Sequence, residues 1–203
     1  MKYFHVNHIS QYSPQKNLEV GDVIELSSKE FNPYYKSILN RQKHIKVGGK
    51  EIPLLKFFDG VQRGQYKEHP EISDPKTIAK FAHSLLDDFI QFHRETHFEN
   101  IRSAEFPHLP SRLNCIWLAS SYEEAVSWSQ RLTDRKKPRI VQVELESEPF
   151  QANECHLFQD TELTKITLER ARNYWNGYGG NGRTELLYVG KLTVLEVFQI
   201  PGS

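Results

Sequence analysis

Hydrophobic and polar residues alternate along several stretches of the chain, and this alternation predicts strands. Apolar and β-branched runs predict strands over residues 2–9, within 114–121, over 140–146, and as two strands over 185–200 that break at Gly190–Lys191. Glycines predict a turn at Gly21–Asp22 and a hairpin turn within 47–52. In the first strand His5 shares a face with Tyr3 and Asn7.

A second pattern, with apolar residues three and four positions apart, predicts helices. The clearest helix has Asp74 as its N-cap and Pro75 at its first position, and runs to about residue 98. Its stripe is predicted to face a core and consists of Ile78, Phe81, Ala82, Leu85, Leu86, Phe89 and Phe92. Ser121 and Glu124 form a capping-box pattern that opens a second helix. The inward positions of that helix are predicted to be Ala125, Trp128 and Leu132.

A third helix is predicted over residues 161–176, with Leu163, Ile166, Ala171 and Trp175 as inward positions. The chain has 203 residues and shows no internal repeat, low-complexity tract or composition shift that would mark a linker. We therefore expect one α+β domain over 1–203.

Composition narrows the classes of function without selecting one. The 26 basic and 26 acidic residues balance, so no overall charge favours nucleic acid or a membrane surface, although a local patch stays open. No apolar run is long enough to span a bilayer, and residues 1–10 lack the apolar core of a signal peptide. Two cysteines without a pairing pattern favour a reducing compartment, so we expect a cytoplasmic protein.

Three residues occur in the order His5, Trp117 and Glu185, each where a predicted strand meets a loop or a helix start. They lie in "YFHVNHI", in "CIWLASSYEEAVSWS" and after the loop "YGGNGR". In this order the segments resemble the first-strand histidine, the aromatic strand–serine–helix unit and the glutamate strand of the ADP-ribosyltransferase fold. The chain departs from the usual pattern at two positions, with Asn7 where the family commonly has Thr and Trp117 where it has Tyr.

The resemblance implies a split antiparallel β-sheet core with flanking helices, and makes residues 27–100 a subfamily insertion containing a long helix. It implies that the protein transfers ADP-ribose from NAD to a macromolecule, with RNA as one candidate acceptor. Residues 98–118 are also similar to a bacterial ADP-ribosyltransferase-like family with members in anti-phage toxin operons. This similarity implies a role as a bacterial toxin or phage-defence effector, with an antitoxin protein as a candidate partner.

The same resemblance assigns roles to the candidate site residues. Glu185 would stabilise the positive charge that develops on the ribose, as carboxylates do in glycoside cleavage. His5 would bond a ribose hydroxyl and Trp117 would stack on nicotinamide. Ser120 and Ser121 would bond the cofactor's amide or a phosphate.

Two further residues would contact the acceptor. Arg183 lies two residues before Glu185 and suits an anionic or nucleobase-bearing acceptor, and Tyr178 suits stacking on a base. Arg102 and Arg112 are candidates for the NAD diphosphate, but ion pairing is favoured for both.

Each candidate also has a structural interpretation. His5 alone is more often a structural histidine, Trp117 a core aromatic, Ser121 an N-cap, and Glu185 or Arg183 a surface charge. Two other functions stay open: a catalytically silent NAD- or nucleic-acid-binding module, and a phosphotransferase acting on an RNA 2′-phosphate.

Other chemistries fit less well. The glycine loop is neither a P-loop nor a Rossmann fingerprint, because no Gly-Lys-Ser/Thr follows and the loop precedes a strand. We expect no metal site, since His5 and His8 lie on opposite faces of their strand and the cysteines lack ligand spacing. Cys115 lies in a hydrophobic strand and is more often an inert thiol than a nucleophile.

Overall fold

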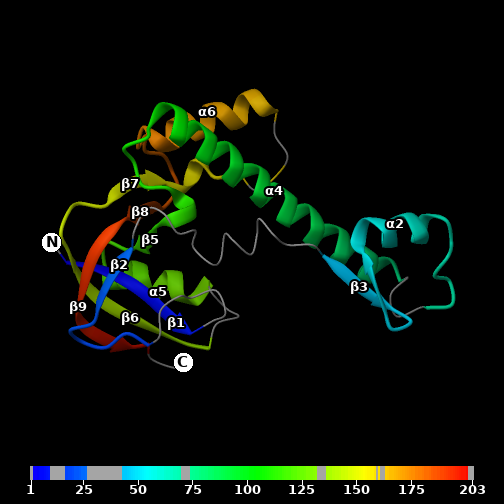
Figure 1. Cartoon of the computed structure of the whole chain (residues 1–203), viewed down its shortest axis with the longest axis horizontal. Coiled ribbons are helices and arrows are strands. Elements are labelled where there is room, and N and C mark those ends of the chain that lie inside the picture. The colour runs from blue at the N-terminus through cyan, green and yellow to red at the C-terminus, as the bar shows by residue number, and fades with distance from the viewer. Residues whose placement is uncertain are drawn as a thin grey trace.

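The computed structural model of the chain describes residues 2–9, 17–26, 43–69, 74–131, 136–158, 160 and 163–200. Its body contains two antiparallel sheets (Figure 1). The four-stranded sheet has the order β1–β6–β9–β2 and is built from β1 (Lys2–Ile9), β6 (Lys136–Leu145), β9 (Gly190–Gln199) and β2 (Val23–Leu26). The three-stranded sheet has the order β5–β8–β7, from β5 (Ile116–Leu118), β8 (Thr184–Tyr188) and β7 (Phe150–Asn153).

The two sheets meet between β1 and β5. Phe4 and Ala119 exchange both backbone hydrogen bonds, at 2.9 and 2.8 Å. Apolar side chains from both sheets then pack together, among them Val141 and Val143 of β6 and Leu186 and Tyr188 of β8. The result is an α+β body in which a short bridge joins two sheets. The end of β5, which pairs with the start of β8, lies beside that bridge.

Helices cover both sheets. α5 (Tyr122–Arg131) packs on β1 and β6, where Ala125 joins Val6 and Ile140 in a buried cluster. α6 (Thr164–Trp175) packs against α4 (Pro75–Glu105), and its Tyr174 and Trp175 are buried with Phe98 and Leu187. Two short 3₁₀ turns, η1 (Arg112–Asn114) and η2 (Glu154–His156), lead into β5 and follow β7.

The N-terminal half of α4 extends away from both sheets and carries a small unit at its end (Figure 1). This unit, which we call the arm, contains the hairpin β3 (His44–Val47) and β4 (Lys50–Pro53) and the helix α2 (Leu54–Gln62). Its cluster of Ile45, Val47, Leu54 and Phe57 packs against Phe81 and Leu85 of α4, among others. The arm therefore has an apolar core of its own.

The fold confirms most predicted elements and corrects several details. The strand predicted over 140–146 begins earlier, at Lys136. α4 begins at Asp74 and Pro75 as expected, but it continues to Glu105, and the predicted stripe does not face one core. Phe81 and Leu85 pack in the arm, whereas Leu86 and Phe89 are 49% and 60% exposed. Leu86 and Phe89 lie on the middle part of α4, between arm and body (Figure 1), and no described residue buries their side chains.

In α6, Ala171 and Trp175 are buried as predicted, but Leu163 and Ile166 are exposed. Leu163 is the N-cap of α6, and Ile166 lies in its first turn. Leu132 lies outside the described residues. Within the described ranges, no helix combines the length and hydropathy needed to cross a membrane.

Candidate functional site

Glu185 is the second residue of β8, and two donors hold its carboxylate. The Tyr174 hydroxyl donates to Glu185 Oε2 at 2.7 Å, and Arg112 Nη1 donates to the same oxygen. Oε1 makes no hydrogen bond to the residues that the structure describes. The side chain is 12% exposed. One carboxylate oxygen is therefore anchored and the other is available to a ligand.

Arg112 connects Glu185 to a second carboxylate, the buried Glu95 of α4. Arg112 Nε donates to Glu95 Oε2 at 2.9 Å, and Arg112 Nη1 donates to the Tyr174 hydroxyl at 2.6 Å. Burial raises the pKa of Glu95, but the charges and hydrogen bonds of Arg112 and Arg94 outweigh it, so this pKa lies below its usual value. Burial raises the pKa of Tyr174, and the Glu185 charge adds to this rise, so Tyr174 stays protonated and can donate.

The proline-containing segment before β5 explains how Arg112 reaches the interior. Pro107 and Pro110 prevent a helix there, and α4 ends at Glu105. Ser111 then caps η1 by accepting from the Leu113 N–H at 3.1 Å, while its hydroxyl donates to Glu99 of α4 at 2.7 Å. These bonds fix the start of η1, whose first residue is Arg112.

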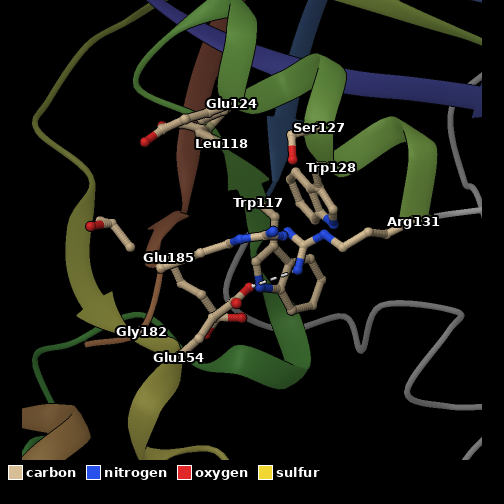
Figure 2. A pocket seen from close by; sticks show the side chains of 12 residues that line it. Trp117, Leu118, Glu124, Ser127, Trp128, Arg131, Glu154, Gly182 and Glu185 are labelled. Atoms are coloured by element: carbon tan, nitrogen blue, oxygen red, sulfur yellow. Dashed lines mark hydrogen bonds and ion pairs between the residues drawn. The ribbon is translucent and has the colours of Figure 1, made fainter. Parts of the chain in front are cut away.

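A pocket of about 410 Å³ opens over Glu185 (Figure 2). Trp117 of β5 and Glu185 of β8 line it together. Further charged and aromatic lining residues come from α5, η2 and the glycine-rich loop, namely Glu124, Trp128, Arg131, Glu154 and Arg183. Two indoles, two guanidiniums and three carboxylates in one cavity suit a ligand with both a flat ring and charged groups.

The glycine-rich loop is held to the end of β7. The Asn153 side chain donates to the carbonyls of Gly182, at 3.1 Å, and Gly180, at 3.4 Å, and its oxygen accepts from the Cys155 N–H at 2.9 Å. At Gly182 a Cβ would overlap the Cys155 backbone and the Asn153 side chain. The loop therefore enters β8 along a defined path, which fixes the backbone of Glu185.

His5 does not line this pocket. Its Nδ1 lies 3.0 Å from the backbone carbonyl of Trp117. Its neighbours Phe4 and Val6 pack under α5, and strand alternation turns the His5 side chain to the other face. Burial lowers the pKa of His5, although the bond to Trp117 opposes this, so the ring is neutral at pH 7 and supports the strand that carries Trp117.

Ser120 and Ser121 stand at the start of α5 and do not line the pocket. The Ser121 hydroxyl accepts from the Glu124 N–H at 3.2 Å, as in a capping box. Glu124 reaches back one residue further than expected, because its carboxylate accepts from the Ser120 N–H and hydroxyl, at 3.0 and 2.7 Å. The contacts of both serines are those of a helix cap.

Of the two residues expected to contact an acceptor, Arg183 lines the pocket and Tyr178 does not. Tyr178 is 58% exposed, and its carbonyl lies 3.0 Å from His156 Nε2. Arg102 pairs with Glu99 and donates to the Leu109 carbonyl at 3.0 Å. For Arg102 and Arg112, the ion-pair interpretation of the sequence is the one that the structure bears out.

Several pocket residues were missed from the sequence. Glu124, Ser127, Trp128 and Arg131 occur at i, i+3, i+4 and i+7 and form one face of α5. That spacing was visible, but Trp128 was assigned to the core, and its indole does pack partly there. Glu154 and the buried partner Glu95 carried no comparable signal. Tyr174 is recognisable in the sequence as an aromatic near Arg183 that could stack on a base, but its bond to Glu185 is not.

Other groups in the described residues offer less chemistry. Within these ranges, no three His, Cys, Asp or Glu residues are grouped so that they could hold a metal ion. Burial raises the pKa of the Cys115 thiol well above its usual value, so it remains protonated. The pocket over Glu185 is accordingly the candidate site.

Comparison with known proteins gives a family but no activity. The family model described as "Protein of unknown function (DUF2441)" matches residues 3–200, which is nearly the whole chain. None of the curated proteins compared with the chain matches it.

Proposed function

The chain belongs to the DUF2441 family, and we propose that it is a mono-ADP-ribosyltransferase that cleaves NAD with Glu185 as its catalytic carboxylate. A cytoplasmic macromolecule receives the ADP-ribose, and RNA is the first candidate. The observation that carries the proposal is the pocket shared by Trp117 and Glu185, in which one oxygen of Glu185 is anchored and the other is available.

The anchored carboxylate suits cleavage of a glycosidic bond. When the bond from the ribose C1′ to nicotinamide breaks, its electron pair leaves with the nicotinamide nitrogen and positive charge develops on the ribose. Glu185 Oε1 would accept a hydrogen bond from a ribose hydroxyl and stabilise this charge. The acceptor's nucleophile then forms its bond to C1′ and loses a proton.

Trp117 supplies a flat surface beside that carboxylate (Figure 2). An indole face stacks well on a pyridine ring, which would orient the bond to be broken toward Glu185. Because β5 and β8 pair directly, with Trp117 opposite Leu187, the two side chains come from neighbouring strands of one sheet.

The arrangement of the sheets also supports the proposal. Two antiparallel sheets meet at one bridge between β1 and β5, which agrees with the split core that the ADP-ribosyltransferase resemblance implies. The position of His5 favours a second candidate, a catalytically silent NAD- or nucleic-acid-binding module. Here His5 supports the Trp117 strand from outside the pocket, whereas the proposed ribose contact needs it inside.

The test uses NAD labelled in its adenylate, with cell lysate or total RNA as acceptor. Nicotinamide release and transfer of label are followed for the wild type, Glu185→Gln and Glu196→Gln, an exposed glutamate of β9 outside the pocket. We expect Glu185→Gln to lower the rate roughly a hundredfold or more and Glu196→Gln to leave it unchanged. The amide keeps an oxygen for the Tyr174 hydroxyl, and thermal unfolding checks that the variant is folded.

The outcomes separate the candidates. Full activity of Glu185→Gln contradicts the proposed mechanism. NAD binding without nicotinamide release by the wild type supports the silent module.

A further inference from the structure

Arg131 and Glu154 form an ion pair inside the pocket. Arg131 is the last residue of α5, and its Nη1 lies 3.5 Å from Glu154 Oε1 of η2 (Figure 2). Their side chains are 44% and 30% exposed. A long, solvated ion pair of this kind contributes little to folding, so it can be exchanged for another partner at small cost.

The other two carboxylates of the pocket have different partners. Glu124 accepts from Ser120, and Glu185 is held by Arg112 and Tyr174. Glu154 is thus the carboxylate that occupies Arg131, and a ligand anion entering the pocket would compete with it.

The surroundings of Arg131 fit a nucleoside diphosphate. A guanidinium binds phosphate through paired N–H donors, and Arg183 adds a second cation to the same cavity. Trp128 lies nearly one turn before Arg131 on the same face of α5 and offers an indole for a base.

We propose that Arg131 is an anion-binding residue that exchanges the Glu154 carboxylate for the phosphates of a nucleoside diphosphate, whose base stacks on Trp128. The Glu154 backbone N–H donates to the Arg183 carbonyl at 2.7 Å, so the exchange moves side chains and leaves the loop before β8 in place. The inference rests on the proposed function only in naming NAD as the natural ligand. The subsite itself is proposed only to bind the diphosphate at Arg131 and the base at Trp128.

The test titrates ADP and adenosine into the protein, with binding followed by calorimetry at constant salt. In Glu154→Gln, Arg131 has lost its competitor, and we expect ADP to bind about two- to fivefold more tightly. In Arg131→Ala we expect ADP affinity to fall about tenfold or more. Adenosine lacks the phosphates, so its affinity should be the same in the wild type and both variants.

A matched ion pair outside the pocket serves as control. Arg139 and Glu19 lie 2.8 Å apart and do not line the cavity, so Arg139→Ala and Glu19→Gln should leave ADP affinity unchanged. Unchanged ADP affinity in Glu154→Gln or in Arg131→Ala would overturn the proposal, as would a wild type that does not bind ADP. Because ADP carries no bond to nicotinamide, the titration stands apart from the NAD-cleavage assay, and either proposal can fail alone.

Discussion

Arg112 lies between two carboxylates from distant parts of the chain, and its charge makes their burial possible. Glu95 comes from α4 and Glu185 from β8, and both contact this one guanidinium. Arg94 adds a second cation at Glu95, so the group contains two positive and two negative side chains. Removing one member leaves an uncompensated buried charge, which is far more costly than losing an exposed ion pair.

Glu95→Gln tests this network through its pH dependence. At pH 7 we expect the variant to lose roughly 3 kcal/mol of unfolding free energy, because Arg112 and Arg94 lose a buried counter-charge. The folded-state pKa of Glu95 lies below its usual value of 4.5, so the stabilisation is fully present above that value. It is lost as the pH falls through the lower folded-state pKa, where wild-type Glu95 takes up a proton.

The difference in unfolding free energy between wild type and Glu95→Gln should therefore decrease below about pH 4.5. Urea unfolding at pH 7 and at several lower pH values measures this difference. Glu105→Gln is the control, because Glu105 also has a lowered pKa from its bond to Arg172 but is exposed, so only a small change is expected. If the difference in unfolding free energy between Glu95→Gln and wild type stayed constant as the pH falls, Glu95 would not be charged in the folded protein at pH 7.

For single residues, the sequence predicted a contact only where the two partners are close together in the chain. The Ser121 cap and the strand position of Trp117 follow from neighbours in the chain, and both were predicted. The partners of Glu185 could not be predicted, because Arg112 lies 73 residues before it and their contact depends on how the sheets and helices pack. The same holds for His5, whose side chain contacts the Trp117 carbonyl and does not line the pocket.

Elements with a covered face were predicted better than elements that span open space. The strands β6, β8 and β9 contribute buried residues to one core cluster, so their apolar and β-branched runs indicated strands. β6 nevertheless begins at Lys136, before the predicted start at Ile140. α4 was recognised as a helix, but its apolar stripe packs in the arm at one end, and its buried apolar contacts with the body come from Ile90, Phe98 and Ile101. Helical spacing alone does not say how many partners a helix has.

The loop before β8 gives a prediction at the element scale. Gly182→Ala would place a Cβ against the Cys155 backbone and the Asn153 side chain, so the loop must shift. Because Glu185 follows three residues later, we expect NAD cleavage to fall roughly tenfold to a hundredfold and stability by about 1–3 kcal/mol. Initial rates of nicotinamide release and thermal unfolding measure the two effects.

Gly179→Ala is the matched change in the same loop, since no atom lies within 4 Å of a Cβ built there. It should leave both measurements close to wild type. Equal effects of the two substitutions would mean that loop flexibility, and not the close approach at Gly182, sets the position of Glu185.

At the scale of the whole molecule, the α+β class followed from the sequence, but the separation of arm and body did not. Residues 27–100 were predicted to be an insertion, and the described part of the arm lies within that range. Its own core of β3, β4 and α2 packs on α4, whereas the site lies at the junction of the two sheets. Among the described residues, the arm and the site therefore share the helix α4 and no buried cluster.

This separation predicts that a substitution that destabilises the arm leaves the stability of the body unchanged. Phe57 is completely buried there and stacks with Tyr66, so Phe57→Ala should cost the arm about 3–5 kcal/mol. In hydrogen exchange we expect faster exchange in β3, β4, α2 and the first turns of α4, with β6, β8 and β9 still protected. Leu55→Ala on the exposed side of α2 should change neither region. If β8 lost protection together with the arm, α4 would be transmitting the change to Glu95 and so to the Glu185 network.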